Sequence, residues 1–175
     1  FICVEKYESV MVRAIEKLEN LEINNLKLIR YDATTIDKVF DKEIDTLYLN
    51  FSDPWPKSRH AKRRLTSPIF LSMYDHIFKN EKKIIQKTDN IGLFAYSLET
   101  LNNYGYHFNK VSLDLHNEDI PNIKTEYEVK TKALSYLIEK YGNNNFKIID
   151  IGRDFEEFGF MSSDYLDCYV VSAIY

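Results

Sequence analysis

The sequence predicts an α/β fold in which a mostly parallel sheet is flanked by helices. Short apolar runs of strand length alternate along the chain with segments whose apolar residues recur at helical spacing. Strands that are separated by helices are typical of right-handed βαβ units, in which successive strands lie parallel. A length of 175 residues with 45% hydrophobic content suits one domain with a packed core.

The apolar pattern predicts each element in turn. Strands are expected over residues 1–5, 26–31, 46–51, 82–87 and 107–113. Helices are expected over residues 7–21, 36–40 and 67–78, and from Asn90 to about Asn103. The first helix has Val10, Met11, Ala14, Ile15, Leu18 and Leu21 at helical spacing. Pro68 suits the first turn of the third helix, and Gly105 ends the fourth. A further helix over 129–141 and strands over 147–152 and 167–175 complete the pattern.

Acidic residues follow four of the predicted strands: Glu5, Asp32, Asp53 and Asp89. Ligands of an open α/β sheet bind in the crevice at the carboxyl ends of its strands, which is where these four residues fall. An acid that ends the second strand commonly accepts hydrogen bonds from the ribose of a nucleotide-like cofactor. The alternative is that these residues only form turns and helix caps.

A rigid acidic turn, Asp53-Pro54-Trp55-Pro56, runs directly into the basic run of residues 57–64. The cations of this run are Lys57, Arg59, Lys62, Arg63 and Arg64, with His60 among them. The net charge of the chain is -4, so this is a local basic site, expected on a loop, that suits phosphates of a nucleic acid. Trp55 offers a ring that stacks on a base or packs in the core.

Little in the sequence supports a metal site, a membrane-spanning protein or an ATPase. Cys3 and Cys168 lie far apart without metal-ligand spacing, and we expect two buried, reduced thiols. No metal site is predicted. No apolar run approaches the length of a membrane span, and no Gly-rich loop with Lys-Ser/Thr indicates an ATPase.

Four segments together resemble the bacterial tRNA (guanine-N7)-methyltransferases, the TrmB family. NFSDPWPKSRHAKRRL at Asn50 to Leu65, here called the signature segment, resembles the loop that marks this family. FICVEKYESVMVRAIEKL at the start, KTDNIGLFAYSL at Lys87 to Leu98 and VSLDLHN…TEYE from Val111 to Glu128 agree in order and spacing. The resemblance implies a Rossmann-like class I methyltransferase that uses S-adenosylmethionine to methylate N7 of a guanine in the tRNA variable loop.

The resemblance also implies roles for individual residues. Glu5 would hold the cofactor ribose, Asp32 would lie by its adenine, and Asp53 would stand at the methyl-transfer centre in contact with cofactor and guanine. The substrate would be bound by Lys57, Asp89, Thr125, Glu126, Tyr127 and Glu128. The tRNA backbone would follow Arg59, His60, Lys62, Arg63 and Arg64. The resemblance implies tRNA as the partner and a cytoplasmic location without a membrane. The protein would be a monomer or a homodimer.

Two departures from the family pattern lead to an alternative hypothesis. The Gly-rich cofactor turn of the family does not precede Phe1, and residues after about Val129 do not match. We therefore expect a methyltransferase domain over residues 1–141, which lacks its first strand and glycine turn, and a divergent extension over 142–175 that completes the sheet or replaces the first strand. The alternative function is a catalytically impaired fragment that acts only as a tRNA-binding module.

Overall fold

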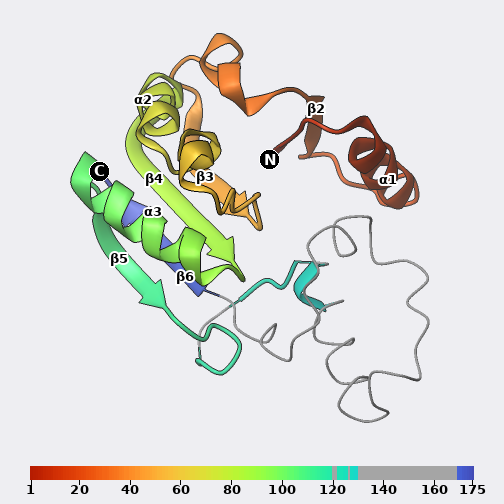
Figure 1. Cartoon of the computed structure of the whole chain (residues 1–175). Coiled ribbons are helices and arrows are strands. Elements are labelled where there is room, and N and C mark those ends of the chain that lie inside the picture. The colour runs from red at the N-terminus through yellow and green to blue at the C-terminus, as the bar shows by residue number, and fades with distance from the viewer. Residues whose placement is uncertain (120–121, 126, 130–168) are drawn as a thin grey trace.

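The computed structural model describes residues 1–119, 122–125, 127–129 and 169–175 (Figure 1). Its α-helices are α1 (Glu8–Leu18), α2 (Pro68–Ile77) and α3 (Ile91–Tyr104), and two 3₁₀ helices are η1 (Ala33–Lys38) and η2 (Ser58–Arg63). Its strands are β1 (Ile2–Glu5), β2 (Lys27–Arg30), β3 (Ile44–Asn50), β4 (Phe78–Thr88), β5 (His107–Ser112) and β6 (Tyr169–Ile174). The predicted helix over 129–141 and strand over 147–152 lie almost wholly outside the described residues.

The predicted order of strands and helices is confirmed through β5, with two differences. The basic run forms η2 rather than a loop, because the amides of His60 and Arg64 donate to the carbonyls of Lys57 and Ala61. Strand β4 starts at Phe78, directly after α2, and not at Lys82. Its first residue already pairs with Ile44, and a register shift follows before the regular ladder.

Two groups of hydrogen-bonded strands make up the described sheet structure. β1 pairs in parallel with β2, and β3 pairs in parallel with β4. β6 runs antiparallel between β4 and β5, so the order of the larger group is β3-β4-β6-β5. The strand predicted near the end of the chain therefore lies inside this sheet, although its partners are more than fifty residues away in sequence.

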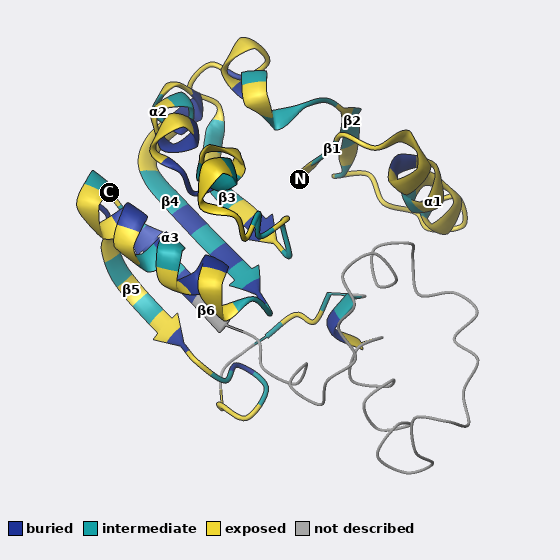
Figure 2. Cartoon of the chain, in the orientation of Figure 1, coloured by how far each residue is buried: buried dark blue, intermediate teal, exposed yellow. Residues whose placement is uncertain are grey.

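Helices α2 and α3 cover one face of the larger sheet, and the core lies between these helices and the sheet (Figures 1 and 2). Side chains alternate across β4, so Ile84, Gln86 and Thr88 point into this core while Ile85 and Lys87 belong to the opposite face. Buried apolar residues of the helices complete it: Phe70, Leu71, Tyr74, Ile77, Leu93, Phe94 and Leu101. None of the helices within the described ranges is long and apolar enough to cross a membrane.

The β1–α1–β2 unit is less buried than its sequence predicts. In α1 only Met11 is buried, whereas Val10 and Ile15 keep 49% and 52% of their surface exposed. The helix was expected from its apolar spacing and is confirmed, and in the described part of the chain its main contacts are with β1 and β2. Cys3 is a free thiol, as expected, but it is exposed rather than buried.

Gly105 closes α3 in a conformation that only glycine adopts easily. Its φ is +109°, and its amide donates to the carbonyls of Leu101 and Asn102. A Cβ at this position would lie 2.9 Å from Cε2 of Tyr175, at the end of the chain. Gly105 thus permits both the helix end and the close approach of the residue that follows β6.

We expect Gly105→Ala to destabilise the fold by roughly 1–3 kcal/mol, because a non-glycine residue at positive φ is strained and the methyl group meets the Tyr175 ring. Urea unfolding of the variant and of wild type measures this difference. Gly92→Ala is the comparison, since Gly92 lies in the first turn of α3 without positive φ, and its added Cβ would meet the Asn90 side chain, at 3.2 Å, rather than a ring. Equal stability of Gly105→Ala and wild type would contradict the proposed strain.

Candidate functional site

The four acids predicted to face a ligand all lie at the carboxyl ends of parallel-paired strands. Glu5 ends β1, Asp32 follows β2, Asp53 follows β3, and Asp89 follows β4. The carboxyl ends of parallel strands meet at one edge of a sheet, so Glu5 and Asp32 share one edge, and Asp53 and Asp89 share another. The structure thus brings these acids together in two pairs.

The first pair of acids is organised by local hydrogen bonds. The half-buried Glu5 accepts a hydrogen bond from the Tyr7 amide through Oε1, at 2.7 Å. Asp32 caps η1 by accepting from the amide and hydroxyl of Thr34, and its Oδ2 lies 2.9 Å from the Lys6 ammonium. The hydrogen bond from Lys6, followed by those from Thr34, lowers the pKa of Asp32 from 3.8 to about 2. Asp32 is therefore a carboxylate at every physiological pH.

The loop that carries Asp53 has an unusual backbone and a specific support. Phe51 and Trp55 both have positive φ, at 49° and 44°, and Asp53 is exposed between them. The half-buried guanidinium of Arg64 donates to the carbonyls of Pro54 and Trp55, at 3.0–3.3 Å, and lies 4.2 Å from the Tyr96 ring centroid on α3. Arg64 thereby ties the strained loop to a core helix.

The remaining cations of the basic run project from η2. Lys57, Arg59, Lys62 and Arg63 are exposed, and the Arg63 guanidinium lies 4.8 Å from the Trp55 ring centroid. His60 meets the Trp55 ring edge-on at 5.8 Å, so Trp55 supports this helix as a packing residue as well as lining the loop. Desolvation, followed by the charges of Arg63, Arg59 and Lys57, lowers the pKa of His60, so the imidazole adds little charge near pH 7.

η2 is fixed to the core at its carboxyl end. Thr66 and Ser67 are both fully buried just after it. The Thr66 hydroxyl lies 2.7 Å from the Ser97 hydroxyl of α3, and the Ser67 hydroxyl donates to the Lys62 carbonyl. The exposed cations are therefore displayed from a short helix with a rigid base.

The described part of the TEYE segment packs over the ends of β3 and β4. The Tyr127 hydroxyl donates to Oδ2 of Asp89 at 2.8 Å, and the Tyr127 ring lies 4.8 Å from the ring of Phe51. Asp89 directly precedes Asn90, whose side chain caps α3 by accepting from the Leu93 amide. One aromatic side chain therefore joins the signature segment to the turn after β4.

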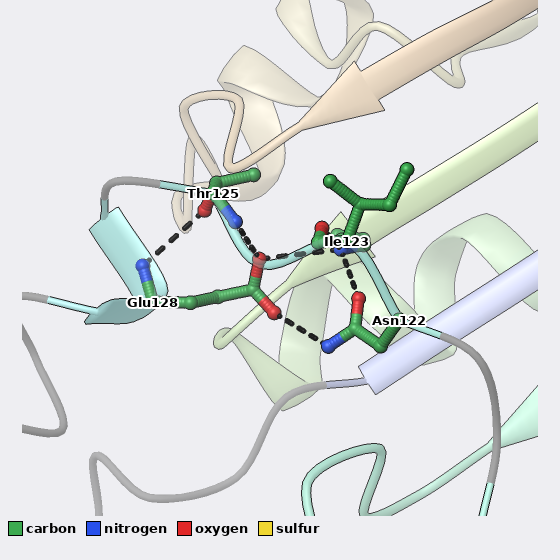
Figure 3. A network of polar contacts seen from close by, with 5 residues as sticks. Asn122, Ile123, Thr125 and Glu128 are labelled. Carbon is green, nitrogen blue, oxygen red and sulfur yellow. Dashed lines mark hydrogen bonds and ion pairs between the residues drawn. The ribbon is translucent and has the colours of Figure 1, made fainter.

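Glu128, next to Tyr127, is buried and forms an ion pair with the partly buried Lys87. Figure 3 shows Glu128 with its neighbours Asn122, Ile123 and Thr125. The Lys87 ammonium is 3.2 Å from Oε2 of Glu128, and it also donates to Asn122 Oδ1 and the Ile123 carbonyl. Glu128 accepts further hydrogen bonds from the Thr125 amide and the Asn122 side chain. Burial alone would raise the pKa of Glu128, but these donors outweigh it and the pKa lies below its ordinary value.

The structure thus brings together Asp89, Thr125, Tyr127 and Glu128 of the predicted substrate residues, while Lys57 stands on the exposed side of the signature segment. Glu126 lies outside the described residues. Sequence reasoning missed the contributions of Phe51, Lys87 and Asn122. Lys87 is the last residue of the strand predicted over 82–87 and directly precedes the Thr-Asp-Asn turn. This position at the end of a strand could have identified it as a candidate site residue.

We expect Lys6→Gln to raise the pKa of Asp32 from about 2 toward 3.8, because the ammonium donor is lost while the Thr34 hydrogen bonds remain. Carboxyl ¹³C NMR titration measures the shift. A lowered folded-state pKa stabilises the fold above about pH 4, and this stabilisation is lost as the pH falls toward 2. The stability difference between wild type and variant should therefore vanish in that range. Lys38→Gln, an exposed charge change at the end of η1, should leave Asp32 unaffected.

Comparison with known proteins agrees with this arrangement. A family described as "Putative methyltransferase" matches residues 1–148. A tRNA (guanine-N(7)-)-methyltransferase from Staphylococcus carnosus (strain TM300) is 52% identical over 132 residues, which are 74% of this chain and 63% of that protein. The protein of the same name from Staphylococcus haemolyticus (strain JCSC1435) is also 52% identical, over 74% of this chain and 62% of its own length. The chain therefore spans less than two thirds of these relatives.

Among solved structures, the [4+2]-cyclase SpnF aligns with a TM-score of 0.54 at 9% identity and covers 98% of this chain and 65% of that one. At such low identity the likeness concerns the fold alone, and it supports the α/β architecture described above. The match to the family model covers most of the chain, so the predicted methyltransferase fold is confirmed and the chain belongs to this methyltransferase family.

Proposed function

We propose that this chain carries the methyl-transfer and tRNA-docking parts of a tRNA (guanine-N7)-methyltransferase that uses S-adenosylmethionine. The observation that carries the proposal is the signature segment: Asp53 lies three residues after the end of β3, and a basic helix held by buried hydroxyls follows it. The 52% identity to relatives of that name over 132 residues supports it. We assign residues 1–141 to the methyltransferase domain and 142–175 to a divergent extension that completes the sheet through β6, in a cytoplasmic monomer or homodimer.

The residues at the ends of β1 and β2 suit the cofactor. Glu5 is half-buried, and one of its oxygens is held by the Tyr7 amide, which orients the other for hydroxyl donors such as those of a ribose. Asp32 stays ionised beside Lys6 and would adjoin the adenine. S-adenosylmethionine, when bound, supplies a methyl group on a positively charged sulfur, and Asp53 would contact it from the adjoining edge.

The reaction needs positioning rather than proton transfer. Guanine N7 has a lone pair in the major groove even when the base is paired, so no side chain has to remove a proton to expose it. Methyl transfer would leave the former positive charge of the sulfur on the guanine, because N7 would supply the electron pair of the new bond and sulfur would keep that of the old one. The Asp53 carboxylate would stabilise this charge, while Lys57, Asp89 and residues 125–127 of the TEYE segment would hold the base.

The tRNA backbone would be bound by the exposed cations of η2. Arg59, Lys62 and Arg63 are exposed beside the loop, with His60 between them. Cations of this kind neutralise phosphates without reading sequence. Arg64 differs because its guanidinium already has two carbonyl partners, so we assign it to the support of the Asp53 loop.

The proposal predicts that Asp53→Ala removes turnover while tRNA binding is retained. We expect the rate of methyl transfer to fall at least ~10²-fold, since correct alignment and charge stabilisation are lost together. Transfer of labelled methyl groups to tRNA, filter binding and calorimetric titration with S-adenosylmethionine give the three readouts. Asp45→Ala, an exposed acid on β3, is the control. The proposal would be contradicted if wild-type protein neither bound S-adenosylmethionine nor transferred labelled methyl groups to tRNA.

The assignment of the cations predicts a difference in salt dependence. Arg59→Gln should reduce the slope of log Kd against log salt by roughly 0.7–0.9, the value for one phosphate contact. Arg64→Gln removes the same charge from the same run, but should leave this slope unchanged and lower the rate of methyl transfer instead. Titrations with tRNA at several salt concentrations test both variants. A slope that falls equally in both would show that Arg64 is a phosphate contact.

A further inference from the structure

Lys87 is the common partner of a whole chain segment that is distant from it in sequence. Its ammonium lies 2.6 Å from Asn122 Oδ1, 2.9 Å from the Ile123 carbonyl and 3.2 Å from Oε2 of Glu128. Three residues spread over seven positions thus converge on one donor near the end of β4. An ammonium has three protons, and these three acceptors match that number.

Glu128 has little capacity left for another ligand. Its side chain is only 1% exposed, and that of Lys87 is 14% exposed. Oε2 accepts from Lys87 and from the Thr125 amide at 2.6 Å, while Oε1 accepts from Asn122 at 3.1 Å. Three protein donors satisfy both oxygens of this buried carboxylate, and a guanine could reach it only if the residues that cover it moved.

Both members of the ion pair lie next to residues of the proposed guanine site. Tyr127, next to Glu128, donates to Asp89 and packs on Phe51. Lys87 is two residues before Asp89, and its carbonyl accepts from the Phe51 amide at 2.8 Å. The backbone of Lys87 therefore holds the start of the signature segment, while its side chain holds the segment that carries Tyr127.

We propose that Lys87 is a positioning residue for methyl transfer, and that Glu128 acts through Lys87 to hold Tyr127 against Asp89 and Phe51 rather than by contacting the base. This inference rests on the proposed function for the identity of the reaction. The contacts of Lys87 with Asn122, Ile123 and Glu128, here called the clamp, do not depend on that function. The inference refines the expectation, drawn from family resemblance, that Glu128 binds the substrate.

Hydrogen exchange tests the clamp without tRNA or cofactor. The Thr125 amide donates to Glu128, so in Lys87→Met we expect it to exchange about 10-fold faster or more as the segment opens. Lys83→Met is the matched control: Lys83 lies four residues earlier on the same face of β4 and should leave this amide within about 2-fold. If Lys87→Met does not fold, Asn122→Ala, which removes one contact from each partner, should give a smaller acceleration.

Kinetics distinguish positioning from base contact. Lys87→Met should lower the single-turnover rate at saturating tRNA roughly 10–100-fold, since a displacement of about 1 Å has effects of this size, with the Kd for tRNA within about 3-fold. The single-turnover rate of Glu128→Gln should be lowered by a similar factor, and the double variant should be no slower than the slower single variant. Lys87→Arg, which keeps the charge, should recover part of the rate.

Two results would overturn the proposal. The first is unchanged exchange at Thr125 in Lys87→Met. The second is a full rate for Lys87→Met beside an impaired Glu128→Gln, because Glu128 would then act on the substrate directly. If wild-type protein transfers no methyl group, the proposed function fails for this chain, while the exchange experiment still supports or refutes the clamp.

Discussion

The parallel pairing of β3 with β4 is the constraint on which the candidate site depends. Asn50 lies opposite Lys87, and one further hydrogen bond, from the Phe51 amide to the Lys87 carbonyl, carries the ladder into the loop. Because both strands run in the same direction, the Asp53 loop and the Asp89 turn emerge at one edge. A strand in the opposite direction would place these acids at opposite ends of the sheet.

Cations near this edge fall into two groups that differ in burial. Lys87 and Arg64 are withdrawn from solvent and bind protein acceptors, one a carboxylate and the other two loop carbonyls. Removing Lys87 would leave the buried Glu128 charge without its ionic partner, which destabilises the fold. Arg59, Lys62 and Arg63 are exposed, and their charges stay available to an anionic ligand at little cost to the fold. Burial thus separates cations that hold the site from cations that can bind phosphate.

Local patterns predicted the elements better than they predicted burial or contacts. The alternation of apolar runs located every strand through β5, and Asn90 and Gly105 cap α3 by the local hydrogen bonds that such residues commonly make. The helical spacing in α1 predicted a helix correctly but overestimated its burial, because burial depends on what packs against the helix. η2 was missed because its two amide–carbonyl bonds leave no periodic signature over so few residues.

Local composition and motifs of fixed spacing were enough to predict the strand–helix order through β5, the four acids at the carboxyl ends of β1 to β4, and the family. Which charges bind partners within the protein could be seen only in the folded chain. Lys87 and Glu128 are 41 residues apart, and Arg64 meets Tyr96 across 32 positions. No local pattern encodes such pairings, because a Lys or Arg reads the same in sequence whether it faces solvent or a buried acceptor. The fold makes that distinction by deciding where water is excluded.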